Sequence, residues 1–331
     1  MSKPLFVAIS DIHFNVNNLE LASTALQAAL DKSEELDIPL VIAGDLHDTK
    51  AIIRAEVANR LLNILNKAKM EKVYILVGNH DLINEKGEEH GLNYLSSHAW
   101  VISSPVSLTI EDREVMFIPY QNTVQKFKTA LAKAPKGSLI VCHQGVQGAH
   151  LGDYVQDKTS IEAGALNDYT LISGHYHRHQ TVGTLTYIGS PFTHTFGESS
   201  DGDKGYLIVA DDGTFERSIL NLRRHVKISI DAYPGVERIT LYPGVNTDDL
   251  LWLQIHGNKD ELNKIDKEKL GQLILGHSNF KLDLIPDEMV IKDATSCEPQ
   301  TAQERLDSLI ERSNDHTSQA AVMKKFWRDL L

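Results

Sequence analysis

The sequence predicts an α/β (α+β) fold, in which a two-sheet β-sandwich core flanked by helices is followed by a small C-terminal α+β unit and terminal helices. Two observations predict this core. Between residues 5 and 77, short apolar runs alternate with helical segments, which is typical of buried parallel strands. Beyond residue 105, strand-like runs follow one another across glycine- and aspartate-rich turns, which indicates a second sheet.

In the first part, apolar runs predict three buried strands, at 5–9, 40–43 and 73–77. Apolar residues at helical spacing predict two intervening helices, at 19–36 and 51–68. Asn17 and Asn18 are candidate N-caps of the first helix.

The middle of the chain begins with a predicted hairpin, 106–110 with 115–118, followed by a helix at 123–134. Five further strands are expected at 139–141, 171–172, 185–188, 206–210 and 218–222.

A change of pattern near Arg224 predicts a domain boundary. We expect a core domain at 1–224, a small α+β domain at 225–300 and a helical segment at 301–331, which opens with a capping box at Thr301. The small domain is expected to contain one helix, 261–275, and strands at 226–230, 239–241, 250–255 and 280–285.

The composition narrows the class of protein. The net charge of −12 over 331 residues argues against a protein that coats nucleic acid through bulk positive charge. No apolar run reaches the roughly 18 residues that span a bilayer, and the N-terminus has no signal-peptide layout. Two cysteines do not make a disulfide framework, so we expect a cytoplasmic protein without membrane contact.

Five short blocks combine metal-ligand side chains with small residues, and each follows a predicted strand. Aspartate, histidine and asparagine in this arrangement supply what a two-metal phosphoesterase site needs. The blocks are Asp11-Ile-His13, Gly44-Asp45-Leu-His-Asp48, Gly78-Asn79-His80-Asp81, Cys142-His143 and Gly174-His175-Tyr-His177.

The spacing within the blocks suggests how they act. Asp11 and His13 alternate by two at a strand end, as do His175 and His177, so we expect each pair to point the same way. Asp45 is the natural bridge, because one carboxylate can bind two ions. Mixed nitrogen and oxygen ligands favour Mn²⁺, with Fe²⁺ or Zn²⁺ as alternatives, over Mg²⁺.

These blocks resemble the calcineurin-like metallophosphoesterase superfamily and imply its fold. The resemblance implies that His80 contacts the phosphate or protonates the leaving oxygen, and that Asp81 orients His80. It also implies that one metal ion is held by Asp11, His13, Asp45 and His177, and the other by Asp45, Asn79, His143 and His175.

A finer resemblance, over about two-thirds of the chain, is to the SbcD-type nuclease subunit of double-strand-break repair. It is carried by Ile118-Pro-Tyr120, Tyr187-Ile-Gly-Ser-Pro191, Phe196-Gly-Glu198 and Lys204-Gly205-Tyr206. The resemblance implies a Mn²⁺-dependent DNA nuclease in end processing, repair and recombination, in which a hydroxide held by two metal ions attacks the phosphodiester. Its activities would be 3′-to-5′ exonuclease on duplex DNA and endonuclease on single strands.

The same resemblance implies partners. It predicts an SbcC-type ABC ATPase docked on 301–331, DNA-groove contact by the capping domain 225–300, and a homodimer built from 51–68 and 92–97.

The chain departs from the SbcD pattern at Asn15, where glycine is usual, and at His47, where an aromatic residue is usual. His47 and Asp48 are candidates for supporting a metal ligand or touching substrate. We expect Asp48 to support or cap, His47 to be a loop residue, and His194 to lie at the surface.

Two alternatives remain. A stand-alone phosphodiesterase of nucleotides or cyclic nucleotides is favoured by the acidic charge, whereas the additional domain after Arg224 favours a large substrate. A non-catalytic scaffold with this fold would typically lack a ligand, and here every motif ligand is present.

Overall fold

The computed structural model describes residues 2–84, 87, 89–152, 155–232, 248–266, 268, 270 and 280–286. These residues form two compact units. The first unit holds those up to 228 together with 248–252 and 280–281; the second holds 229–232, 253–270 and 282–286. The predicted helices after residue 301 and the predicted strand 239–241 lie outside the described residues, so the predicted domain boundaries stay predictions.

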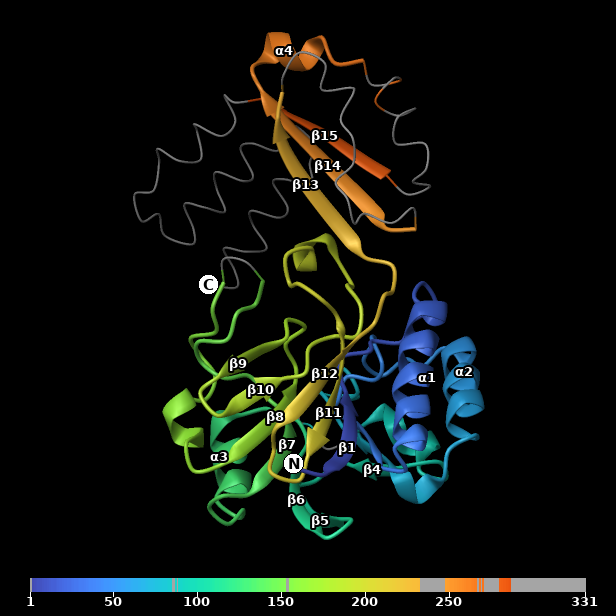
Figure 1. Ribbon diagram of the computed structural model, residues 1–331, viewed down its shortest axis with the longest axis vertical. Coiled ribbons are helices and arrows are strands. Elements are labelled where there is room, and N and C mark those ends of the chain that lie inside the picture. The colour runs from blue at the N-terminus through green and yellow to red at the C-terminus, as the bar shows by residue number, and fades with distance from the viewer. Residues whose placement is uncertain are drawn as a thin grey trace, which may run out of the picture. The chain divides into compact units, whose positions relative to one another are not determined.

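The core of the first unit is two six-stranded sheets, as the sequence predicted (Figure 1). The first sheet has the order β12-β11-β1-β2-β3-β4, and β1 to β4 run parallel. Its strands are β1 (Pro4–Ile9), β2 (Leu40–Ile42), β3 (Val73–Leu76), β4 (Trp100–Ile102), β11 (Gly205–Ala210) and β12 (Phe215–Ile219).

The second sheet has the order β5-β6-β7-β8-β10-β9 and begins with the predicted hairpin. Its strands are β5 (Val106–Ile110), β6 (Arg113–Ile118), β7 (Leu139–His143), β8 (Thr170–Gly174), β9 (Gln180–Val182) and β10 (Leu185–Tyr187).

Alternation along the strands divides the core into layers. In the first sheet, Phe6 and Ala8 face the second sheet, whereas Val7 and Ile9 pack beneath helices α1 (Leu19–Glu35) and α2 (Ala55–Leu65), which lie side by side in Figure 1. Helix α3 (Val124–Leu131) covers the outer face of the second sheet, where the buried Cys142 packs as predicted.

Several boundaries differ from the prediction. Helix α2 begins at Ala55 rather than at 51, because Ala51 has a φ of +60° and the Ile52 amide bonds to Lys50, a short turn that a helix excludes. The strand expected at 218–222 is β12, three residues earlier. The segment at 92–97 is a short 3₁₀-helix, Gly91–Leu95, and strands β4 and β9 were not predicted.

A three-stranded sheet, in the order β13-β14-β15, follows the core along the chain. Its strands are β13 (His225–Asp231), β14 (Leu250–Gly257) and β15 (Phe280–Pro286), close to the predicted positions. Helix α4 (Lys259–Asn263) begins with a capping box at Asn258, and most of the rest of the helix predicted at 261–275 lies outside the described residues. Of the helices that the structure describes, none is long and apolar enough to cross a membrane.

Candidate active site

The five blocks meet at one edge of the sandwich. They follow or end strands β1, β2, β3, β7 and β8. Strands β1 to β3 are parallel to one another in the first sheet, and β7 is parallel to β8 in the second, so the blocks of each sheet lie at the same edge. Hydrogen bonds and close side-chain contacts join all seven predicted ligands: Asp11, His13, Asp45, Asn79, His143, His175 and His177.

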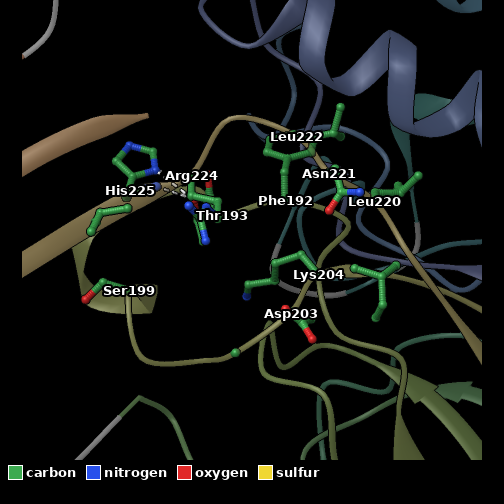
Figure 2. A pocket seen from close by; sticks show the side chains of 13 residues that line it. Phe192, Thr193, Ser199, Asp203, Lys204, Leu220, Asn221, Leu222, Arg224 and His225 are labelled. Carbon is green, nitrogen blue, oxygen red and sulfur yellow. Dashed lines mark hydrogen bonds between the residues drawn. The ribbon is translucent and has the colours of Figure 1, made fainter. Parts of the chain in front are cut away.

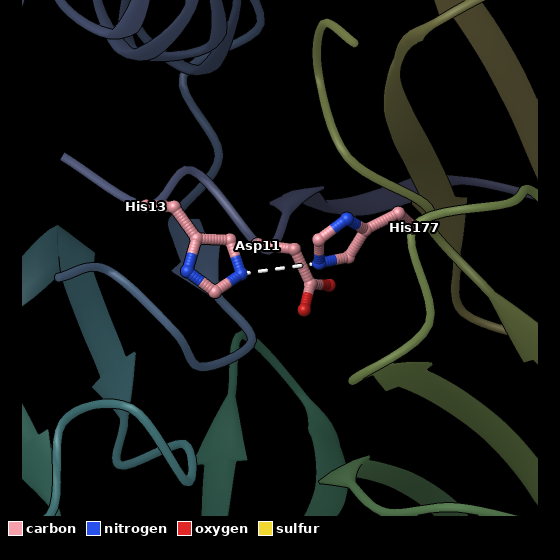
Figure 3. A group of neighbouring side chains, drawn as sticks. All are labelled: Asp11, His13 and His177. Atoms are coloured by element: carbon pink, nitrogen blue, oxygen red, sulfur yellow. Dashed lines mark hydrogen bonds between the residues drawn. The ribbon is translucent and has the colours of Figure 1, made fainter. Parts of the chain in front are cut away.

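Asp11, His13 and His177 form one group, in which the three side chains face one another (Figure 3). One ligand atom of each lies within 4.8 Å of the others, and the two Nε2 atoms of the histidines are 3.1 Å apart. Because Nδ1 of His177 donates to Glu198 at 3.0 Å, its Nε2 carries the lone pair. A carboxylate and two converging imidazole nitrogens are a donor set for a divalent cation.

Asp45, Asn79, His143 and His175 form the second group. The amide oxygen of Asn79 lies 3.1 Å from Nε2 of His143 and 2.8 Å from Nδ1 of His175. Oδ2 of Asp45 lies 3.2 Å from Nε2 of His143 and 3.8 Å from Nε2 of His13. The carboxylate of Asp45 therefore stands between the two groups, where a bridging ligand would lie.

The backbone, rather than strand alternation, aims these side chains. Asp11, His13 and Asp45 have φ angles of +53°, +50° and +51°, and His175 has +95°. The prediction that Asp11 and His13 point the same way because they extend a strand was therefore wrong in its reason. Non-glycine residues with left-handed backbone are costly and concentrate at functional sites.

Glycines allow the blocks to touch. A Cβ atom at Gly78 would overlap the carboxylate and amide nitrogen of Asp45, and one at Gly44 would overlap the ring of His143. A Cβ atom at Gly174 would overlap the hydroxyl of Ser10. The glycine in each of these three blocks is thus needed where residues of another part of the site approach it.

The pKa values reflect burial and mutual charge. Burial raises the pKa of Asp45, but the adjacent imidazoles of His143 and His13 outweigh it and hold the pKa below its usual range. Burial lowers the pKa of His143, yet the charge of Asp45 raises it to about 9. Burial lowers the pKa of His13 to about 2, and burial with the nearby His143 lowers that of His175 to about 3. At neutral pH, and without a metal ion, the carboxylate of Asp45 thus faces a protonated His143, while His13 and His175 are neutral.

His80 lines the cavity beside the two groups, but it is not Asp81 that orients it. Nδ1 of His80 donates to the main-chain carbonyl of Asp48 at 2.7 Å, which leaves Nε2 available for proton transfer. The buried carboxylate of Asp81 instead accepts the amide hydrogens of Leu46, His47 and Gly78. Asp81 therefore ties the second block to the third.

The structure gives His47 and Asp48 different surroundings. Nε2 of the buried His47 lies 2.9 Å from the hydroxyl of Tyr94, so His47 packs as a loop residue. Asp48 lies 3.7 Å from Nδ1 of His13 and accepts a hydrogen bond from Asn15, as a supporting residue would. The asparagine at 15 thus has a use that glycine could not supply.

The structure adds residues that the sequence analysis missed. His194, expected at the surface, is half-buried; it donates to the carbonyl of Asp11, and its ring lies 5.1 Å from that of His13. His150 and Arg178 join the predicted residues around a cavity of about 510 Å³, as does Glu198, which the sequence placed in the SbcD-like pattern but gave no role. Arg178 directly follows the fifth block, which was a usable signal, whereas nothing in the sequence points to His150.

The site suits two divalent cations by an observation independent of its motifs. Nε2 of His13 lies 3.1 Å from Nε2 of His177, whose Nδ1 already donates to Glu198. A neutral imidazole with its hydrogen on Nδ1 presents a lone pair at Nε2, so two such nitrogens that face each other suit a cation between them.

Comparison with known proteins identifies the family. Residues 4–198 match the calcineurin-like phosphoesterase family, and the chain belongs to that family. Over 216 residues, 61% of this chain and 75% of the relative, it is 29% identical to "Putative phosphoesterase 244L" of Invertebrate iridescent virus 6. A solved structure described as a novel archaeal phosphodiesterase is 12% identical, with a TM-score of 0.34, over 65% of this chain and 99% of that one.

Membership defines the coarse activity. The chain is a phosphoesterase of a family whose members use two metal ions, and the clusters of candidate ligands are present.

Proposed function

We propose that the chain is a Mn²⁺-dependent DNA nuclease of SbcD type that processes DNA ends with an SbcC-type ABC ATPase. The observation that carries the proposal is the segment 187–206, which holds the SbcD-like sequence and packs around the metal centre. Within it, Glu198 bonds to Nδ1 of His177, and Lys204 bonds to Glu198 and to the carbonyl of His177.

Different residues would serve different steps of phosphodiester hydrolysis. When bound, two divalent ions supply an activated nucleophile and neutralise charge on the phosphate. His80 is placed to give a proton to the leaving oxygen through Nε2, because Nδ1 is occupied by the Asp48 carbonyl. Arg178 lines the same cavity, where a guanidinium can contact a phosphate oxygen.

A polymeric substrate is supported by the three-stranded sheet. The ammonium groups of Lys227 and Lys281 lie 4.9 and 3.9 Å from the ring centroid of Trp252. Aromatic rings with neighbouring cations bind single-stranded nucleic acid through stacking and phosphate attraction. The homodimer through 51–68 and 92–97, and the docking of the ATPase on 301–331, belong to the same proposal.

A stand-alone nucleotide phosphodiesterase is the second candidate. It is favoured by the net charge of −12 and by the cavity of about 510 Å³ beside the ligands, a size typical of small-molecule sites.

The deciding experiment compares hydrolysis of single-stranded DNA, duplex DNA and bis-p-nitrophenyl phosphate in Mn²⁺ and in Mg²⁺. We expect DNA degradation in Mn²⁺ that His80→Ala abolishes and that His98→Ala, outside the cavity, leaves unchanged. Trp252→Ala should weaken action on single-stranded DNA and spare the small diester. Hydrolysis of the diester with DNA left intact would establish the second candidate, and no hydrolysis of any substrate would indicate a scaffold.

A further inference from the structure

Each metal-binding group contains one imidazole whose far nitrogen is anchored, and the two anchors differ in kind. Nδ1 of His143 donates to the main-chain carbonyl of Ala43, at 2.7 Å, directly after strand β2. Nδ1 of His177 donates to the side-chain carboxylate of Glu198 at 3.0 Å. The side chain of His143 is fully buried, whereas that of His177 is 31% exposed.

Glu198 is itself held firmly. Its Oε2 accepts from Nζ of Lys204 at 3.1 Å, from the amide of His194 at 3.2 Å and from the hydroxyl of Ser190 at 3.4 Å. Burial raises the pKa of Glu198, but its bond to His177 and the charge of Lys204 bring the pKa below its usual range. The carboxylate is therefore charged, oriented and ready to accept the Nδ1 hydrogen of His177.

Lys204 in turn holds Glu198 in place. Its ammonium also donates to Ser190, to Asp201 and to the carbonyl of His177. Its stem lines a second cavity of about 460 Å³, together with Asp203 and Arg224 (Figure 2). A change at Lys204 would alter that cavity as well, so Glu198 is the residue that isolates the anchor of His177.

A carboxylate bonded to the far nitrogen of a histidine fixes the tautomer and raises the basicity of the nitrogen that binds metal. The main-chain carbonyl of Ala43 fixes the tautomer of His143 in the same way, but it adds no negative charge. We propose that Glu198 is a positioning residue that sets the affinity of the Asp11–His13–His177 site. We propose further that the two metal sites are unequal because, among the described residues, a charged side chain anchors the far nitrogen of a histidine in this site and a main-chain carbonyl does so in the other. The proposal rests on the metal centre and not on which phosphoester is cleaved.

The test measures how the metal-free protein binds Mn²⁺. Calorimetric titration gives the affinities of the two sites, and electron paramagnetic resonance shows whether two bound ions are coupled. Glu198→Ala should weaken one of two sites about 10- to 100-fold and leave the other within about twofold. At one equivalent of Mn²⁺ per site, the spectrum should change from a coupled pair to an isolated ion. Glu198→Gln keeps an acceptor oxygen without the charge, so we expect an intermediate loss at the same site.

Glu216→Ala, which removes an exposed carboxylate from β12, is the matched control. Equal weakening of both sites, or unchanged binding in Glu198→Ala, would overturn the proposal. If the alanine variant does not fold, the glutamine variant decides by the same criterion. Because the readout is metal binding, failure to cleave DNA would count against the proposed function alone.

Discussion

The two sides of the metal centre are built by different means. On one side, His143 is held by a main-chain atom, because it donates to the carbonyl of Ala43; the shared Asp45 likewise accepts the amide of His80. His177, on the other side, is held by the side chain of Glu198. The difference teaches that a sheet edge can fix one half of a site almost unaided, while the other half needs partners recruited from a distant loop.

The largest expected effect comes from the residue that both sides share. Asp45→Asn keeps the shape and the bond from the His80 amide but removes the charge between the two groups. We expect loss of both metal ions and a fall in turnover of the small diester of roughly a thousandfold or more. Metal content and initial rates measure this.

Asp48→Asn is the matched control, because Asp48 lies beside His13 without belonging to the predicted ligands. A variant Asp45→Asn that retained both ions would show that Asp45 is not the bridge.

The main-chain side can be broken by one methyl group. In Gly78→Ala the new Cβ would overlap the carboxylate and amide of Asp45, so strand ends must move apart. We expect a loss of about 1 to 3 kcal/mol in the free energy of unfolding, with weaker metal binding. Gly164→Ala, where a Cβ would have no neighbour within 4 Å, should change neither. Equal melting temperatures of the two variants would contradict the packing argument.

The pH dependence of metal affinity tests how His143 differs from the other imidazoles of the site. Metal ions bind neutral imidazole, and the pKa of His143 is raised to about 9 by Asp45, although burial opposes this. At pH below 9 a metal ion must displace that proton, so affinity should rise about tenfold per pH unit. The pKa values of about 2 for His13 and about 3 for His175 mean that these rings add no proton above about pH 4.

Calorimetry of Mn²⁺ binding in two buffers of different ionisation enthalpy counts the released protons between about pH 6 and 8. We expect one proton per protein, from His143. Affinity that does not change with pH would show that His143 is not charged in the metal-free protein.

The sequence predicted the strand ends, and the residues that gather there, because both depend on local patterns. Apolar runs place β1, β2 and β3, and the ligands follow these strands directly in the chain. It did not foresee the left-handed backbone at Asp11, because that conformation is imposed by hydrogen bonds across strands, such as the amide of Asp11 to the carbonyl of Gly44.

Hydrogen bonds between residues far apart in the chain could not be predicted for the same reason. Glu198 meets His177 only after β9 and β10 have turned the chain back, and His194 meets Asp11 across most of the core domain. Apolar periodicity predicts which face of a strand is buried, but it says nothing about which polar side chain in a distant loop completes a hydrogen bond.

The smallest effect on turnover is expected at His47, which lies outside both metal-binding groups. Its ring is buried against the hydroxyl of Tyr94 and does not line the catalytic cavity. His47→Phe, which restores the aromatic residue of the SbcD pattern, should lower the free energy of unfolding by about 1 to 3 kcal/mol, because the tyrosine hydroxyl loses its partner. Turnover of DNA and of the small diester should stay within about twofold, as measured at saturating Mn²⁺. A selective loss on DNA would instead give His47 a part in substrate binding, which its burial argues against.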